Sequence, residues 1–192
     1  MQYLLTPYAE PLEPFVWLEN TFNEQELDWL QDHAKKANQN GQLGGGAVNS
    51  NIRRSQISWM ENNKDSNWIY HKLAHAVSSI NSKFYRFDLT GFGESLQFTN
   101  YDQSEHGMYR WHQDFGTLQT SNRKLSVVVQ LTDPSEYEGG NLQLMTNGQP
   151  MNVRKERGLL VAFPSWQVHQ VTPVTQGSRQ SLVMWISGPA FK

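Results

Sequence analysis

The sequence is organised around the stretch Tyr109-Arg110-Trp111-His112-Gln113-Asp114. Side chains of an extended strand alternate between its two faces, so we expect His112 and Asp114 on one face, about 7 Å apart. An imidazole and a carboxylate on one face can converge on a single metal ion. Because a His-X-Asp triplet is common by chance, this interpretation depends on further ligands elsewhere in the chain.

Two residues downstream supply that support. His169 follows the apolar run of residues 158–163, which predicts a buried strand that ends in a turn at Pro164. A second histidine from a neighbouring strand would complete a set of two histidines and one carboxylate, which is diagnostic of non-haem iron(II) oxygenases. Arg179 lies just after a turn signal and can grip a carboxylate through two parallel hydrogen bonds. Iron(II) beside such a clamp suggests a 2-oxo acid as co-substrate.

The whole pattern Tyr101…Tyr109…His112-X-Asp114…His169-X9-Arg179 resembles the 2-oxoglutarate- and iron(II)-dependent dioxygenases of the prolyl 4-hydroxylase type. Residues 138–142 (EGGNL) and 169–174 (HQVTPV) strengthen the resemblance, which covers roughly residues 14–188. It implies that three residues bind Fe(2+) and form the catalytic set: His112, Asp114 and His169. It also implies that Arg179 pairs with the distal carboxylate of 2-oxoglutarate.

The resemblance extends to further co-substrate residues. Tyr101 matches a tyrosine whose hydroxyl helps to hold 2-oxoglutarate. Gln130 falls where relatives often carry a second co-substrate tyrosine, so it either contacts 2-oxoglutarate or is a satisfied core glutamine. Collagen-type enzymes carry lysine at the position of Arg179. The arginine makes this chain more similar to the oxygen-sensing and bacterial prolyl hydroxylases. Related halogenases carry a small residue in place of the carboxylate at the position of Asp114. Because this chain keeps the carboxylate, hydroxylation is favoured over halogenation. O2 is the implied oxidant, and ascorbate (vitamin C) stays open as a further cofactor.

Bulk properties fit an enzyme of this kind. The chain has 192 residues, a formal net charge of -2 and no cysteine, so disulfides and thiolate catalysis are excluded. The small net charge gives no reason to expect a nucleic-acid or membrane partner. The first residues lack a basic start and contain prolines, and no apolar run reaches the length of a membrane span. We therefore expect a soluble, cytoplasmic protein, with its oligomeric state open.

The order of patterns along the chain predicts an α+β, mainly β fold. An N-terminal arm (1–14) precedes helical support over about 23–82, in which Asn23 and Glu26 form a capping box for a helix over 24–38 and Ser66 caps a second helix. Short alternating segments then predict strands at 85–89, 95–101, 108–114, 124–132, 140–145, 158–163, 167–172 and 179–187. Helices followed by eight short strands indicate a double-stranded β-helix (jelly roll, cupin-like) with its core over about 85–188, in a single domain over 1–192.

Residues 38–46 are too rich in glycine for regular structure, and a long loop in a small domain is uncommon unless it is functional or disordered. The loop over 41–54 is either a lid over the substrate or an idle surface loop. Arg53 and Arg54, at the anchored end of this loop, and Trp59 lie in a predicted short strand. The arginines are either a solvated edge or, together with Trp59, part of a substrate rim. Trp166, on the turn before His169, is a further candidate at the substrate mouth.

Three functions are compatible with these patterns. The first is hydroxylation of a prolyl residue in a peptide or protein. The second is hydroxylation of a free amino acid or another small molecule. The third is a non-catalytic, cupin-like metal-binding or sensor protein, which Arg179 disfavours because a metal store needs no carboxylate clamp.

Overall fold

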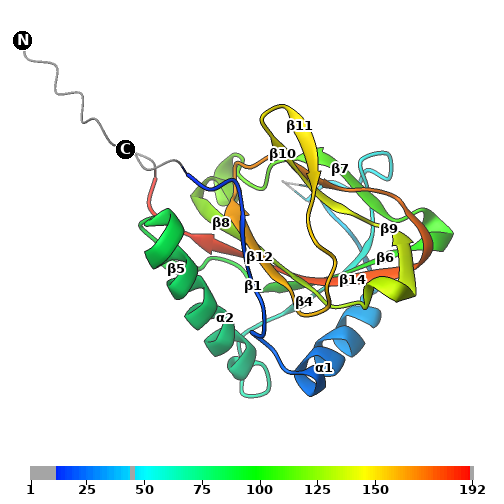
Figure 1. The fold of residues 1–192 in the computed structure, drawn as a ribbon, viewed down its shortest axis with the longest axis horizontal. Coiled ribbons are helices and arrows are strands. Elements are labelled where there is room, and N and C mark those ends of the chain that lie inside the picture. Colours follow the sequence, from blue (N-terminus) through cyan, green and yellow to red (C-terminus); the bar gives the residue numbers. More distant parts are fainter. Residues whose placement is uncertain (1–11, 44–45, 191–192) are drawn as a thin grey trace, which may run out of the picture.

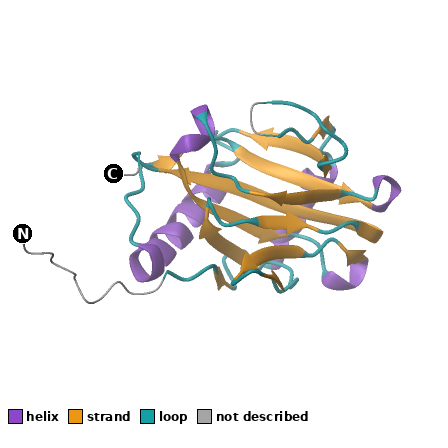
Figure 2. Cartoon of the chain, turned by 90° about the horizontal axis from the view of Figure 1, so that it is seen from above, coloured by secondary structure: helices purple, strands orange, loops and turns teal. Residues whose placement is uncertain are grey.

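The computed structural model describes residues 12–43 and 46–190. Two antiparallel sheets lie face to face, and two helices cover the outer face of the larger one (Figures 1 and 2). The predicted N-terminal arm falls mostly outside the described residues. The mainly β class and the supporting helices are as predicted.

The strands of the larger sheet are β1 (Val16–Leu18), β2 (Gln39–Asn40), β4 (Gln56–Met60), β5 (Gly91–Phe92), β6 (Leu96–Asp102), β8 (Arg123–Gln130), β9 (Tyr137–Gly139), β12 (Leu160–Pro164) and β14 (Val174–Ser187). Their order is β1-β12-β8-β14-β6-β4-β2, and β5 and β9 pair with β14. The strands of the smaller sheet are β3 (Arg53–Arg54), β7 (Met108–His112), β10 (Leu142–Thr146), β11 (Gln149–Asn152) and β13 (His169–Val171). Their order is β11-β10-β13-β7-β3. Short 3-10 turns lie at Gln103–Glu105, Leu118–Asn122 and Pro134–Glu136.

Helix α1 (Glu24–Lys35) begins as the sequence predicts. Asn23 Oδ1 accepts a hydrogen bond from the Glu26 backbone at 3.0 Å, and the Glu26 carboxylate accepts one from the Asn23 backbone at 2.8 Å. This reciprocal pair satisfies two of the free N–H groups at the helix start. The helix ends three residues before the predicted position 38, because the chain turns to pair β2 with β4. Residues 38–46 therefore contain a short strand, contrary to the sequence interpretation.

Helix α2 (Asn67–Ile80) continues into a π-helical turn, Asn81–Tyr85. The hydroxyl of Ser66 donates to the Glu61 carbonyl at 2.6 Å and does not cap the helix. The strand predicted over 85–89 is wrong, because Arg86 adopts a left-handed backbone conformation with φ 53°. The Asn81 side-chain amide donates to the Phe87 carbonyl and accepts from the Phe87 backbone N–H, both at 2.9 Å. These local bonds fold the segment back onto the helix end.

The core has two layers that meet at the larger sheet. Along β8, Val127 and Val129 pack toward the helices, whereas Val128 packs between the sheets. In β12, Leu160 and Ala162 alternate with Val161 and Phe163 in the same way. Because both faces of these strands are buried, they appear in the sequence as unbroken apolar runs. The layer between the two sheets is the one that contains the candidate site.

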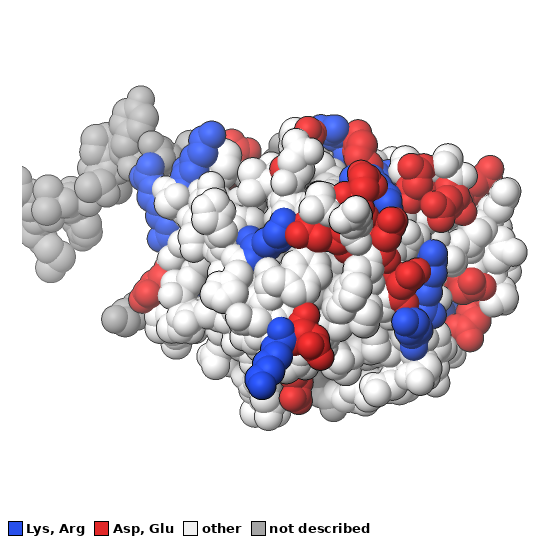
Figure 3. All heavy atoms as spheres, turned by 90° about the horizontal axis from the view of Figure 1, so that it is seen from below, with Lys and Arg blue, Asp and Glu red and all other residues white. Residues whose placement is uncertain are grey.

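The helical face carries charges of both signs. Figure 3 shows acidic and basic side chains side by side on this face, with no broad basic patch. Glu24 and Asp28 on α1 pair with Arg157, at 2.8 and 2.7 Å. Among the described residues, none of the helices is long and apolar enough to cross a membrane.

Candidate iron and co-substrate site

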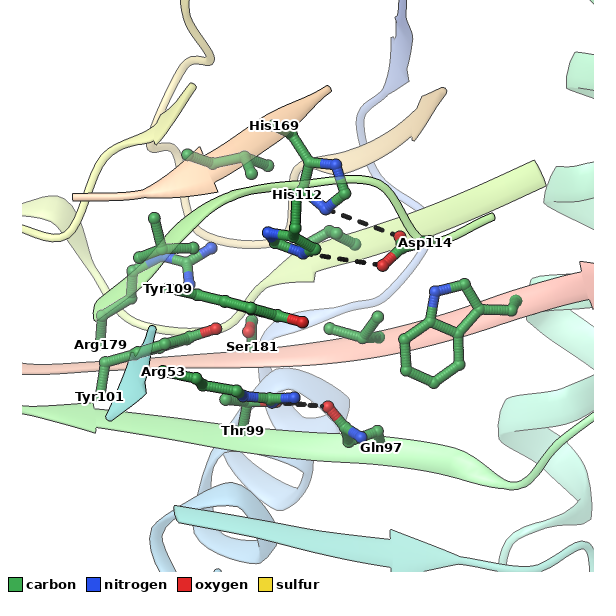
Figure 4. Close-up of a pocket in the computed structure, with 15 residues that line it drawn as sticks. Arg53, Gln97, Thr99, Tyr101, Tyr109, His112, Asp114, His169, Arg179 and Ser181 are labelled. Carbon is green, nitrogen blue, oxygen red and sulfur yellow. Dashed lines mark hydrogen bonds and ion pairs between the residues drawn. The ribbon is translucent and has the colours of Figure 1, made fainter. Parts of the chain in front are cut away.

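The three predicted metal ligands come together at one end of the space between the sheets. His112 ends β7 and lies directly opposite His169, the first residue of β13. Their Nε2 atoms lie 3.7 and 3.6 Å from the two carboxylate oxygens of Asp114, and the three candidate ligand atoms lie within 4.8 Å of one another (Figure 4). Two imidazoles and one carboxylate on one side of an ion leave its other positions open for small molecules.

Backbone carbonyls orient both imidazoles. His112 Nδ1 lies 2.7 Å from the Arg110 carbonyl, and His169 Nδ1 lies 2.9 Å from the Gln167 carbonyl. A carbonyl only accepts, so each Nδ1 carries the proton and each Nε2 keeps a lone pair that faces the site. This is the tautomer that a metal requires.

Asp114 is held by different means from those the sequence suggested. Strand β7 ends at His112, so Asp114 lies two residues beyond it instead of on the same strand face. Its backbone N–H donates to the Ser165 carbonyl at 2.9 Å, and its carboxylate accepts from the Ser126 hydroxyl at 2.7 Å. Arg123 also donates to its carbonyl at 3.2 Å. Contacts with β8 and with the turn after β12 therefore position Asp114, and strand alternation does not.

The protonation states favour metal binding. Burial, followed by repulsion from His169, lowers the pKa of His112 to about 3. Burial alone would raise the pKa of Asp114, but the two histidines and the Ser126 hydrogen bond outweigh it and lower the pKa to about 2. At neutral pH the site therefore offers a neutral imidazole and a carboxylate anion, which are the ligand forms that metals bind.

A bulge in β7 brings another ring into the site. His169 pairs with His112 but Val171 pairs with Tyr109, so β7 has one residue more than β13 over this span. The extra residue puts Tyr109 and His112 on the same face, where their rings stack with centroids 3.4 Å apart. Burial raises the pKa of Tyr109 to about 12, so its hydroxyl stays protonated. Plain alternation would place these residues on opposite faces. The family pattern in the sequence includes Tyr109 but gives it no role.

An interior cavity runs from the metal ligands to Arg179 (Figure 4). Arg179 is only 1% exposed, and its Nη2 donates to Gln130 Oε1 at 2.8 Å. Its Nε has no hydrogen-bond partner, and no carboxylate among the described residues pairs with it. A buried guanidinium with an unused donor is strongly disfavoured unless an anion reaches it. The residues present therefore fit 2-oxoglutarate, whose distal carboxylate Arg179 would bind.

The other two predicted co-substrate residues occupy different positions. Tyr101 lines the cavity, with the Arg179 guanidinium 5.5 Å from its ring centre. Gln130 does not line it: its amide oxygen accepts from Arg179, and its amide nitrogen faces the Arg154 carbonyl at 3.5 Å. Of the two alternatives for Gln130, the structure favours a satisfied core glutamine that orients Arg179.

The four residues predicted for the substrate rim lie in different places. Arg53 lines the cavity and also a wider groove at its mouth, and Trp59 lines that groove. Arg54 points elsewhere, donating to the His106 and Ser50 carbonyls. Trp166 packs against Phe87 with ring centres 5.4 Å apart and is not among the residues that line the cavity or the groove.

Several lining residues were missed by the sequence interpretation although a signal existed. Strand periodicity from Arg179 along β14 leads to residues that all line the cavity: Ser181, Val183 and Trp185. The same rule applied from Tyr101 along β6 leads to Thr99 and Gln97. Trp185 also forms the mouth, where the Arg123 guanidinium lies 3.8 Å from its ring centre and pairs with Glu94 at 2.6 Å.

Comparison with known proteins gives the class that this fold and site define. Residues 96–187 match the 2OG-Fe(II) oxygenase superfamily. This segment contains β6 to β14 and every residue proposed above for iron and 2-oxoglutarate. The resemblance found in the sequence is therefore confirmed over this part of the chain.

Relatives of the chain are hydroxylases. A PKHD-type hydroxylase of Prochlorococcus marinus is 35% identical over 83 residues, 43% of this chain and 38% of that protein. One of Synechococcus sp. (strain CC9605) is 39% identical over 79 residues, 41% of this chain and 36% of that protein. The chain thus spans less than half the length of these curated relatives.

Two solved structures share the fold over most of both chains. A prolyl hydroxylase of Trichoplax adhaerens, in complex with a peptide fragment of the hypoxia inducible factor oxygen degradation domain, aligns with a TM-score of 0.77 at 18% identity, covering 91% of this chain and 83% of that one. A Pseudomonas putida prolyl-4-hydroxylase aligns with a TM-score of 0.74 at 22% identity, covering 91% and 92%. The predicted double-stranded β-helix is confirmed.

Proposed function

We propose that this protein is a 2-oxoglutarate- and iron(II)-dependent dioxygenase that hydroxylates a prolyl residue in a peptide or protein. One oxygen atom of O2 enters the substrate C–H bond as a hydroxyl group. The other enters succinate, which forms with CO2 from 2-oxoglutarate. The observation that carries the proposal is one cavity with the two-histidine, one-carboxylate set at one end and, at the other, Arg179, which has no carboxylate partner among the described residues.

The residues divide the work between binding and orientation. His112, Asp114 and His169 would hold iron(II), which supplies O2 activation when bound. Arg179, oriented by Gln130, would fix the distal carboxylate of 2-oxoglutarate and so the position of its reactive end. The apolar side chains Val128, Leu142 and Val183 line the same cavity and exclude water from it.

A peptide substrate is supported by the mouth of the site. Beyond the interior cavity, a wider groove is lined by Trp59, Trp185 and the chain around Leu118, which is 78% exposed. Exposed apolar side chains along a groove are typical of a surface that binds a polypeptide. The structurally similar Trichoplax adhaerens enzyme was solved with a peptide.

The test is succinate formation from 2-oxoglutarate by the iron(II)-loaded protein, with a panel of proline-containing peptides and free amino acids. We expect succinate to rise with at least one peptide, which gains the mass of one oxygen atom. Asp114→Ala is the matched control and should form none. Coupled turnover with free amino acids alone would replace the peptide by a small molecule. Metal binding without turnover of any kind would leave the non-catalytic sensor.

A further inference from the structure

A second buried arginine, Arg53, lines the interior cavity that runs from the metal ligands to Arg179, called the reaction chamber below. Arg53 is 7% exposed, on β3 at the edge of the smaller sheet, where it pairs with Tyr109 of β7. Its side chain lines both the interior cavity and the groove at the mouth (Figure 4). It therefore lies where a substrate passes from the groove to the metal site.

Only neutral groups hold the Arg53 guanidinium. Its Nε donates to Ser55 Oγ at 2.8 Å, Nη1 to the Gln42 carbonyl at 2.9 Å, and Nη2 to Gln97 Oε1 at 2.9 Å. Among the described residues, no carboxylate forms an ion pair with it. Three of the five N–H groups of the guanidinium are used, so one on each terminal nitrogen is left for a further acceptor. A buried charge without a counter-ion is costly unless a ligand supplies one.

The surroundings are shaped to keep this side chain in place. A Cβ atom at Gly41 would lie 2.5 Å from Arg53 Nε and would also collide with the Ser55 hydroxyl. The Gly41 backbone N–H donates to the Ser55 carbonyl at 2.8 Å, which holds the loop against the arginine. The neighbouring Arg54 has no such enclosure and donates to carbonyls outside the cavity. The chain therefore positions one arginine of the pair in the chamber.

Arg53 and Arg179 address different parts of the chamber. Figure 4 shows Tyr109 between His112 and Arg53, and the Arg53 guanidinium lies 4.8 Å from the Tyr109 ring centre. Arg179 instead faces Tyr101. In the proposed function, 2-oxoglutarate places one carboxylate at the metal and the other at Arg179. Both of its anionic ends are then used, and Arg53 is left for a different anion.

We propose that Arg53 binds a carboxylate of the substrate next to the carbon that is hydroxylated. This inference rests on the proposed function and narrows its substrate class. The carboxylate can come from an acidic side chain beside the target residue, or from the α-carboxylate of a target residue at the end of a chain. Bidentate pairing with the two free N–H groups would hold the substrate backbone in one register beside Tyr109.

Peptide binding without O2 tests this directly, because no turnover can occur. The iron(II) and 2-oxoglutarate complex is titrated anaerobically with two kinds of matched peptides, all amidated unless stated. In the first, a glutamate at each position near a central proline is exchanged for glutamine. In the second, a C-terminal proline is a free acid or an amide. We expect the acid of at least one pair to bind roughly tenfold to a hundredfold more tightly, and the pair identifies the source of the carboxylate.

Variants assign that preference to Arg53. Arg53→Gln should reduce the acid-to-neutral ratio to about one and leave the affinity for 2-oxoglutarate unchanged, Arg53→Lys should keep part of the ratio, and Arg54→Gln should keep all of it. If Arg53 only ties the 41–43 loop to β6, its replacement weakens the binding of the acid and the neutral peptide equally. The acid-to-neutral ratio then stays unchanged, which overturns the proposal. Equal binding of both members by the unmodified protein, or no binding of either acid, overturns it too. Failure of the proposed function is distinct, because it shows as absence of succinate with every substrate in air.

Discussion

Replacing Arg179 with methionine should make the ligand-free protein more stable while it weakens 2-oxoglutarate binding. The guanidinium is 1% exposed, lacks a carboxylate partner among the described residues and leaves Nε without a hydrogen bond. Exchange of buried charges for apolar side chains of similar volume is often neutral or stabilising by about 1–4 kcal/mol. Loss of the Gln130 contact offsets part of this gain, since a buried amide oxygen then loses its donor at a cost of about 1–3 kcal/mol. We therefore expect the free energy of unfolding to stay level or rise by about 1 kcal/mol.

The same substitution should remove most of the stabilisation by ligand. Truncating one partner of a buried charged pair costs about 2–5 kcal/mol, so 2-oxoglutarate affinity should fall at least roughly thirtyfold. At a ligand concentration of about 100 times the original Kd, binding stabilises the unmodified protein by about 2.7 kcal/mol. A thirtyfold weaker variant retains about 0.9 kcal/mol at that concentration.

Urea unfolding of the metal-loaded protein without O2, with and without 2-oxoglutarate, measures both effects. Arg157→Met is the matched control, because Arg157 is an arginine paired with two carboxylates, Glu24 and Asp28. It should lower stability slightly and leave the shift caused by 2-oxoglutarate intact. An Arg179→Met variant that is stabilised by 2-oxoglutarate as much as the original protein would refute the assignment of Arg179 as the co-substrate clamp.

Four further outcomes follow from the site. Asp114→Ala should abolish succinate formation with an unchanged circular dichroism spectrum, and activity restored by added iron(II) would contradict its role. Ser126→Ala should weaken iron(II) binding roughly tenfold to a hundredfold in a chelator competition, because the Asp114 carboxylate loses its 2.7 Å donor. In metal-free protein, folded His112 stays neutral down to a pKa of about 3 while the unfolded chain takes up the proton near 6.5, so lowering the pH from 7 to 5 should cost about 2 kcal/mol of stability; His112→Gln should remove this slope. Proteolysis at Gly44–Gly46, of which the first two lie outside the described residues, should slow with iron(II), 2-oxoglutarate and substrate if the loop is a lid, whereas equal rates would indicate an idle loop.

Strand periodicity explains which parts of the site the sequence could predict. The long strand β14 alternates between the helical layer and the cavity, so Arg179 marks the phase for all later residues of the strand. Separate strands are also well marked where both faces are buried, as in β8 and β12. These features depend only on local alternation and burial, which the sequence records directly.

Departures from regular strands could not be predicted in the same way. The bulge that aligns Tyr109 with His112 depends on the register between β7 and β13, which are far apart in the chain. The position of Asp114 depends on Ser126 of β8 and on Ser165 in the turn after β12. Similarly, Arg53 and Gln56 belong to different sheets because the chain crosses over at Ser55, although residues 53–59 look like one strand. Each of these is a tertiary constraint that overrides the local pattern.

The balance of charge links the metal, the co-substrate and the proposed substrate. In the proposed function, iron(II) bound by Asp114 would leave one positive charge in the chamber, and Arg179 and Arg53 would each add another. The 2-oxoglutarate dianion would cancel two of these three. One positive charge would then stay beside Tyr109, at Arg53, which has no carboxylate partner among the described residues. Because excess charge in a water-poor cavity is costly, a substrate that brings one carboxylate completes the neutralisation, and a neutral substrate does not. With iron(II) and 2-oxoglutarate bound, the acid-to-neutral ratio of peptide affinities should therefore be larger for the unmodified protein than for Arg53→Lys. Lysine keeps the charge but loses the fork that pairs with both carboxylate oxygens.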